Sequence, residues 1–232
     1  MDCSQLKNKN ESNLVTKSNS FIRSHYGISL NEKRLLELIV SKINPLSFSC
    51  RQVYPIEISM SDYNETFNLQ SSSGSRDFVF ALDKLLTRFV KIKNGESFKA
   101  YPLLSSVEYK DKQAKAICKI NQHLNDHFIE LKKGFTSYSL SDATSFQSFY
   151  TWRLYELALS WKTKGCFEIK IEDLKNILEI PSSYRWTHIK SQIIDYSLRS
   201  IFKDTQLLIT YQIIKLCRKI FALKFKICGL DK

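Results

Sequence analysis

The sequence lacks the features that would place it in a membrane or hold it together by cross-links. No apolar run in its 232 residues approaches the roughly 18 residues that cross a bilayer. Its six cysteines are scattered without Cys-x-x-Cys spacing, which argues against a zinc module and against a disulfide framework. The first residues are polar and do not contain the apolar core of a signal peptide. We therefore expect reduced cysteines and a cytoplasmic protein.

Motifs of nucleotide hydrolysis and strand cutting are also missing. No Gly-x-x-x-x-Gly-Lys-Ser/Thr loop is present, so nucleotide hydrolysis is not expected. Rolling-circle initiators and relaxases combine two metal-binding histidines around one apolar residue with a tyrosine nucleophile, and this chain has no such histidine pair. His123 and His127 are four residues apart, but no third ligand follows at a suitable spacing, so a surface pair on a helix is favoured over a metal site. We predict a non-enzymatic protein with no catalytic residues, no metal and no cofactor.

Positive charge is what the sequence has in excess. Its 35 Lys and Arg residues outnumber 23 Asp and Glu, and the net charge is +12. Residues 183–232 alone hold ten Lys or Arg against three Asp, a net charge of +7. Such a surface favours polyanions, either nucleic acid or an anionic membrane. Nucleic acid is favoured because the C-terminal charges interrupt strand-like rather than helical apolar patterns.

The chain also contains an internal repeat. Residues 55–69 align with residues 166–180, 111 positions further on, with identities at Glu57/Glu168, Ile58/Ile169 and Asp62/Asp173. In each copy a short alternating strand runs into an amphipathic helix, and a longer helix precedes it. A polar turn, a second helix with basic residues and a run of strands follow each copy. This order of elements is typical of a winged helix.

We therefore predict an α+β protein built from two tandem winged-helix (helix-turn-helix plus β-hairpin wing) domains. Residues 1–13 are expected to form a flexible polar tail, residues 14–131 the N-terminal domain and residues 132–232 the C-terminal domain. Within them, Ser29 and Glu32 have capping-box spacing for a helix start, and Asn94-Gly95 predicts a hairpin. A strand should begin near Val53 and a long helix near Ser145.

The helix predicted from about Arg185 to Lys203 is the best candidate for contact with DNA bases. In helix-turn-helix proteins the second helix enters the major groove and its first turns reach the base edges. A basic helix taken alone would more often be an ordinary solvated face, but the repeat and the basic hairpin that follows favour DNA. The candidate base readers, which combine guanine readers, an adenine reader and hydroxyls, are Arg185, Thr187, His188, Lys190, Ser191 and Gln192.

The closing hairpin is the candidate wing. Lys215, Arg218 and Lys219 lie around its tip, where they would touch phosphates or a minor groove, although such cations can also keep a sheet edge soluble. Because Asp77 and Asp83 oppose the basic residues of the first domain, we expect phosphate contact there more than base contact, or a partner protein. The auxiliary DNA contacts of that domain would be Ser72, Ser73, Ser75, Arg76 and Lys84.

Three stretches of the chain carry a family likeness. They are residues 13–19 with 29–36, residues 131–140 with 153–157, and Tyr184-Arg185-Trp186 with its helix and the hairpin of residues 215–225. In their order and spacing these stretches resemble the replication initiator (Rep) proteins of iteron-type bacterial plasmids. The likeness covers nearly the whole chain from residue 13.

The resemblance implies winged helices that bind direct repeats (iterons) of double-stranded DNA at a plasmid origin. The C-terminal domain would read most of the DNA sequence, through major-groove contacts made by Arg185, Lys190, Ser191 and Gln192. The N-terminal domain would supply dimerisation and further DNA contact. Family members typically open the origin as monomers and recruit DnaA-type proteins and the replicative helicase. They repress their own gene as homodimers. No membrane partner is implied.

The chain departs from this family at two places in the candidate interface. Relatives often have a basic cluster where this chain has Lys190-Ser191-Gln192, so its base preferences should differ. The usual glycine of the wing is replaced by Cys217, which leaves the shape of the hairpin tip open. Alternatives are a winged-helix repressor without a replication role, a strand-nicking initiator, and an N-terminal domain that chiefly oligomerises through the β-edges of residues 105–120.

Overall fold

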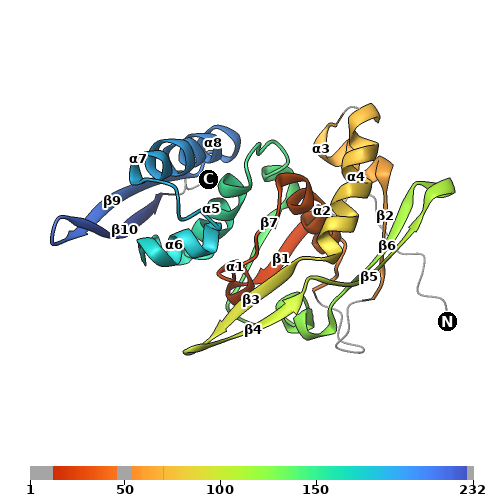
Figure 1. The fold of residues 1–232 in the computed structure, drawn as a ribbon, viewed down its shortest axis with the longest axis horizontal. Helices are drawn as coiled ribbons and strands as arrows, with labels where there is room; N and C mark the ends of the chain where they lie inside the picture. Colours follow the sequence, from red (N-terminus) through yellow and green to blue (C-terminus); the bar gives the residue numbers. More distant parts are fainter. Residues whose placement is uncertain (1–12, 46–53, 70, 229–232) are drawn as a thin grey trace.

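The computed structural model describes residues 13–45, 54–69 and 71–228. Of the tail predicted for residues 1–13, all but Asn13 lie outside the described residues, and so does Val53, the predicted start of a strand. None of the described helices is long and apolar enough to cross a bilayer. The described chain folds as two winged helices side by side (Figure 1), as the repeat predicts.

The first winged helix has the predicted order of elements. At its start Ser29 Oγ accepts a hydrogen bond from the Glu32 N–H at 3.3 Å, so the predicted cap is present. Buried Leu35, Leu36 and Ile39 form the apolar face of the first helix, and the strands form an antiparallel sheet in the order β2-β6-β5. The elements are α2 (Leu30–Ser41), β2 (Ile56–Ser59), α3 (Met60–Phe67), α4 (Ser71–Leu86), β5 (Leu104–Lys110) and β6 (Lys115–Ile120).

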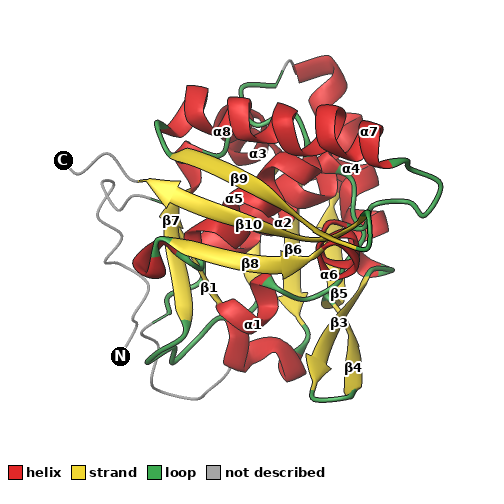
Figure 2. Cartoon of the chain, turned by 90° about the vertical axis from the view of Figure 1, so that its left-hand side faces the viewer, coloured by secondary structure: helices red, strands yellow, loops and turns green. Residues whose placement is uncertain are grey.

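The second winged helix repeats this plan. Its sheet has the order β8-β10-β9, so the strand after the first helix again pairs with the last strand of the hairpin. Figure 2 shows these three strands side by side. The elements are α5 (Phe149–Leu159), β8 (Cys166–Lys170), α6 (Ile171–Leu178), α7 (Trp186–His188), the π-helical segment η5 (Ile189–Asp195), α8 (Tyr196–Thr205), β9 (Leu208–Leu216) and β10 (Lys219–Cys228).

The repeat extends to the backbone. The helices α3 and α6 end at the equivalent residues Asn68 and Glu179, which have left-handed φ of 49° and 53°. One residue later, the N–H of Leu69 donates to Asn64 O and the N–H of Ile180 donates to Lys175 O, each at 2.9 Å. A left-handed residue after the last helical turn satisfies carbonyls that would otherwise lack partners. The same chain reversal therefore leads into the second helix of both domains.

Other elements join and extend the two winged helices. β1 (Leu14–Ser18) pairs with β7 (Phe135–Ser139), so strands on either side of the predicted boundary at residues 131/132 are bonded together and that division stays a prediction. The predicted Asn94-Gly95 hairpin is present, with the turn at Gly95-Glu96. The remaining elements are α1 (Asn19–Ile22), β3 (Phe89–Asn94), β4 (Ser97–Pro102) and the short 3-10 helices η1 (Asp111–Gln113), η2 (Gln122–His127), η3 (Leu140–Asp142) and η4 (Lys162–Lys164).

The structure differs from the prediction at two helices. The long helix of the second domain begins at Phe149 instead of near Ser145, because Ser148 Oγ accepts from the Tyr150 N–H at 3.2 Å and caps the helix there. The segment containing His123 and His127 is a 3-10 helix. His127 is half-buried and its Nδ1 lies 2.8 Å from Ser18 Oγ. The prediction of a surface pair is therefore wrong for His127.

A group of charged side chains is buried where the two winged helices meet. Lys17, Lys33, Glu37, Arg153 and Glu156 come from β1, α2 and α5, and each is 0% exposed. Lys33 Nζ lies 2.6 Å from Glu37 Oε1 and 2.9 Å from Glu156 Oε2, and Lys17 also pairs with both carboxylates. We call these five residues the buried charge cluster. It connects α2 of the first winged helix to α5 of the second, and apolar periodicity in the sequence gives no sign of it.

Candidate nucleic-acid interface

The predicted base-reading helix is one helical run made of α7, η5 and α8. Ile189, Ile193 and Ile194 are at most 1% exposed, and the run contacts α5 through η5 and α8. This buried apolar face turns the polar residues outward. All the predicted base readers are exposed, and the structure gathers them at the N-terminal half of one helical run: Arg185, Thr187, His188, Lys190, Ser191 and Gln192.

The candidate base readers differ in how many hydrogen bonds and ring contacts their side chains make with neighbouring residues. Within the described part of the chain, the side chains of Arg185 and Gln192 make no hydrogen bond or ion pair and can meet a ligand directly. Ser191 Oγ donates to Thr187 O at 2.8 Å, so its proton is used inside the helix and its oxygen remains an acceptor. The His188 ring lies edge-on to Tyr184, with centroids 6.2 Å apart.

Lys190 is held by its neighbours. Its Nζ lies 2.6 Å from Asp195 Oδ2, and Tyr211 Oη on β9 donates to Asp195 Oδ1 at 2.8 Å. The hydrogen bond to Asp195 raises the pKa of Lys190. Burial raises the pKa of Asp195, but the hydrogen bonds from Lys190 and Tyr211 outweigh burial and the net shift is downward. Both members of this pair are therefore charged near neutral pH.

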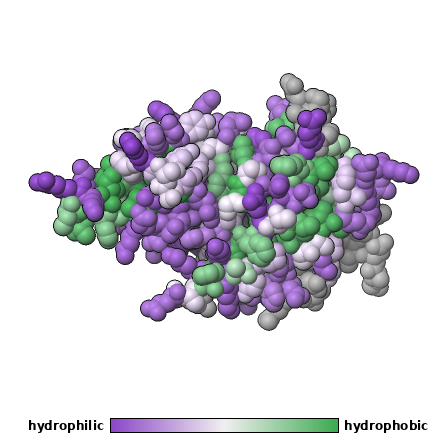
Figure 3. All heavy atoms as spheres, viewed as in Figure 1, coloured by the Kyte–Doolittle hydropathy of each residue, from purple (hydrophilic) through white to green (hydrophobic). Residues whose placement is uncertain are grey.

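The wing is the β9–β10 hairpin, as predicted. Lys215, Arg218 and Lys219 are exposed around its tip, and Lys219 faces Leu216 across the turn. The turn residues Cys217 and Arg218 have φ of 47° and 67°. Two left-handed residues in succession are typical of a type I′ turn, so the hairpin closes tightly without glycine. At the far left of Figure 3, where Figure 1 places this tip, hydrophilic side chains lie beside apolar ones.

The candidate DNA contacts of the first domain are less closely grouped than those of the second domain. The side chains of Ser72, Ser73 and Ser75 lie outside the described ones, although the backbone of α4 is described from residue 71. Arg76 is exposed, whereas Lys84 is half-buried with its Nζ 5.2 Å from the centroid of the Phe80 ring. Eight residues of helix separate these two cations by roughly 12 Å along the axis. Their role in DNA contact stays a prediction.

Two parts of the surface were missed by sequence reasoning. Lys224 and Lys226 are exposed on β10, beside buried Phe225. The alternating Lys-Phe-Lys pattern is a signal that could have identified them as the outer face of the sheet. Asp195 and Tyr211, which hold Lys190, had no comparable signal because residues five apart do not face each other in an α-helix.

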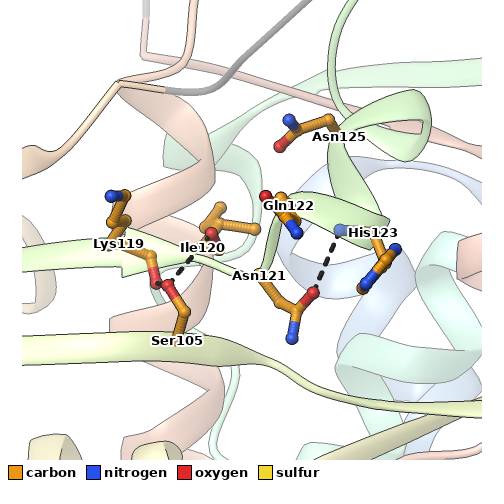
Figure 4. A pocket seen from close by; sticks show the side chains of 7 residues that line it. All are labelled: Ser105, Lys119, Ile120, Asn121, Gln122, His123 and Asn125. Carbon is orange, nitrogen blue, oxygen red and sulfur yellow. Dashed lines mark hydrogen bonds between the residues drawn. The ribbon is translucent and has the colours of Figure 1, made fainter.

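A separate hollow of about 310 Å³ lies between β5, β6 and η2, where Ser105 Oγ donates to the backbone carbonyls of Lys119 and Ile120 (Figure 4). Asn121 Oδ1 accepts from the His123 N–H, and the His123 ring stacks on Tyr101. The Ser105 hydroxyl and the Asn121 amide oxygen are therefore bonded within the chain. No group of three or more His, Cys, Asp or Glu in the described ranges could hold a metal.

Comparison with protein families identifies both domains. A family described as "Initiator Replication protein, WH1" matches residues 14–159, and "Initiator Rep protein, WH2" matches residues 170–227. The chain belongs to the initiator Rep protein family. The two winged helices correspond to these WH1 and WH2 matches, with the WH1 match extending through α5.

Individual relatives are more distant. An Escherichia coli "Replication initiation protein" is 24% identical over 211 residues, and the match covers 88% of this chain and 64% of that protein. An E. coli "Uncharacterized 27.6 kDa protein" is 25% identical over 214 residues, covering 86% of this chain and 89% of that protein. Among solved structures, the Pi initiator protein in complex with iteron DNA matches with a TM-score of 0.77 at 15% identity, over 96% of this chain and 100% of that chain. That likeness shows a shared fold.

Proposed function

We propose that this protein initiates plasmid replication by binding repeated origin sequences (iterons) in double-stranded DNA. One observation carries the proposal: the second winged helix presents a row of exposed polar side chains at the start of its recognition helix, next to a wing with three exposed cations. Membership of the initiator Rep family supports it. So do the name of the E. coli relative and the fold shared with an initiator crystallised on iteron DNA.

The proposed mechanism is binding without covalent chemistry. The helical run from Trp186 would enter the major groove, with Arg185, Lys190 and Gln192 reaching base edges. Lys215, Arg218 and Lys219 on the wing would contact phosphates or a minor groove and fix the register. Binding to several repeats would bend or strain the duplex, at a cost of a few kcal/mol that the added contacts offset. The strained duplex would then open at adjacent A·T-rich DNA.

The proposal extends to the location, the oligomeric state and the partners of the protein. The protein would act in the bacterial cytoplasm, as a homodimer off DNA and as a monomer on iterons, and it would repress its own gene. It would bring DnaA-type proteins and the replicative helicase to the origin. The strand β5 is an edge of the first sheet and offers unpaired backbone groups for dimerisation. Sedimentation with and without DNA tests the change of state, and one stoichiometry in both conditions would count against it.

Arg185→Ala tests the base-reading helix. Arg185 is exposed and uncommitted, so its loss should weaken binding to the origin repeats by roughly 1–3 kcal/mol and relax the preference at one base pair. Lys219→Ala is the matched control. It should weaken binding to all sequences and reduce the salt slope by about one. Fluorescence anisotropy on origin and scrambled duplexes measures both, and an equal loss on the two duplexes for Arg185→Ala would remove that residue from the base readers.

A further inference from the structure

The contact between Lys190 and Asp195 depends on an unusual helix geometry. In an α-helix residues five apart point about 140° away from each other, so the two side chains would not face each other. The segment Ile189–Asp195 is π-helical, and hydrogen bonds in a π-helix join residues five apart. That geometry brings Lys190 Nζ to 2.6 Å from Asp195 Oδ2. π-Helical turns occur frequently at functional sites.

The wing fixes the other side of Asp195. Tyr211 Oη donates to Asp195 Oδ1 at 2.8 Å, and the Tyr211 ring packs against Phe225, with centroids 5.7 Å apart. Phe225 is 0% exposed and stacks on Phe167 at 4.9 Å. A series of aromatic contacts therefore ties the carboxylate on the recognition helix to the core of the wing sheet. The hydrogen bond from Tyr211 therefore fixes the position of Asp195 relative to that sheet.

The Lys190–Asp195 pair, at the end of these contacts, is accessible to a ligand. The side chain of Lys190 is 45% exposed and that of Asp195 is 29% exposed. A free lysine is a flexible, strongly hydrated point charge that contacts any nearby phosphate. A lysine held on one side by a carboxylate has fewer positions available, and the carboxylate itself repels phosphates. Both effects favour a base acceptor at one place over the DNA backbone.

We infer that Asp195 and Tyr211 are positioning residues that set the sequence specificity of the recognition helix by holding the ammonium of Lys190 against one base position. This inference rests on the proposed function, because it needs a sequence that the protein prefers. The ligand group is a hydrogen-bond acceptor on a base edge in the major groove, such as O6 or N7 of guanine.

The test uses Asp195→Asn and Tyr211→Phe in the full chain, each alone and combined with Lys190→Ala. Affinities are measured for the duplex that the wild-type protein protects and for a scrambled duplex, and their ratio gives the specificity. Asp195→Asn should lower this ratio about tenfold while scrambled DNA is bound equally or more tightly, because a negative charge is gone. Tyr211→Phe should lower it about threefold. With Lys190→Ala present, neither change should alter the ratio further.

Asp204→Asn is the matched control. Asp204 is exposed on α8 and interacts with Ser200, so the change removes the same charge without touching Lys190. It should leave the ratio unchanged. If Asp195→Asn does not fold, Tyr211→Phe, which keeps every charge, carries the test.

Two results overturn the inference, and they are distinguishable. In the first, the wild-type protein prefers the repeats, but the Asp195 and Tyr211 variants lose affinity for the repeat and scrambled duplexes by the same factor, or change the ratio equally in the Lys190→Ala background. The positioning role is then wrong and the proposed function stands. If the wild-type protein does not distinguish repeats from scrambled DNA, the proposed function is wrong and the inference falls with it.

Discussion

Glu156 is a fully buried carboxylate surrounded by charged side chains. It lies in the buried charge cluster, where three cations face two carboxylates. Burial raises the pKa of Glu156, but attraction to Lys17, Lys33 and Arg153 outweighs burial and holds the pKa well below its usual value of 4.5. A buried ion pair adds little to stability relative to apolar residues, whereas removing one partner leaves the others uncompensated. The cluster should therefore be sensitive to the loss of any one member.

Glu156→Gln should lower the free energy of unfolding at pH 7 by roughly 3–5 kcal/mol, measured by urea titration. Because the folded pKa is depressed, the ionised carboxylate stabilises the fold above about pH 4.5, and this contribution declines as the pH falls towards the folded pKa. The difference between wild type and variant should therefore shrink from pH 7 to pH 3. A constant difference over that range would contradict this account.

Glu57→Gln is the control for this prediction. Glu57 is exposed on β2 and pairs with Lys115 at 2.7 Å in solvent. An exposed pair contributes little to stability. The control should therefore change stability little at any pH.

Among the elements, the wing carries visible backbone strain at its tip. Cys217 adopts a left-handed φ of 47° where type I′ turns favour Asn or Gly, and a left-handed conformation costs most residues about 1–2 kcal/mol. Cys217→Asn should therefore raise the free energy of unfolding by about 0.5–1 kcal/mol. Chemical denaturation measures this gain. Cys166→Asn, at an exposed position in β8, should give no gain, and an equally stable or weaker Cys217→Asn variant would show that the turn is not strained.

The sequence predicted most elements because the signals were local. The 111-residue repeat placed the strand and first helix of both domains, and the spacing of Ser29 and Glu32 located a helix start. The start of α5 was placed too early because Ser145 and Ser148 both suit a cap, and only the structure shows that Ser148 Oγ is the acceptor. The local signal was ambiguous there.

The candidate site was predictable only in part. Exposed polar residues on a helix with an apolar face follow from the 3.6-residue period, and Arg185 to Gln192 were found in that way. The link from Lys190 through Asp195 to Tyr211 needs a π-helical turn and a contact between helix and strand, neither of which has a sequence signature. The buried charge cluster joins residues up to 139 positions apart, and charged residues are ordinarily predicted at the surface.

For the whole molecule, the relative placement of the two winged helices is the main consequence of the fold. Figure 1 shows the β9–β10 tip and the β5–β6 tip at opposite ends of the long axis. The two winged helices are joined by the buried charge cluster and by an ion pair of 3.0 Å between Lys93 and Asp173.

This basic molecule should recognise repeated DNA sequences. DNase footprinting on the DNA that flanks its gene, at near-physiological salt and with excess competitor DNA, separates recognition from non-specific phosphate contacts, because those contacts weaken steeply with salt. We expect regularly spaced protection over direct repeats. A single protected inverted repeat at the promoter would contradict the replication role, and diffuse protection that salt abolishes would contradict sequence recognition altogether.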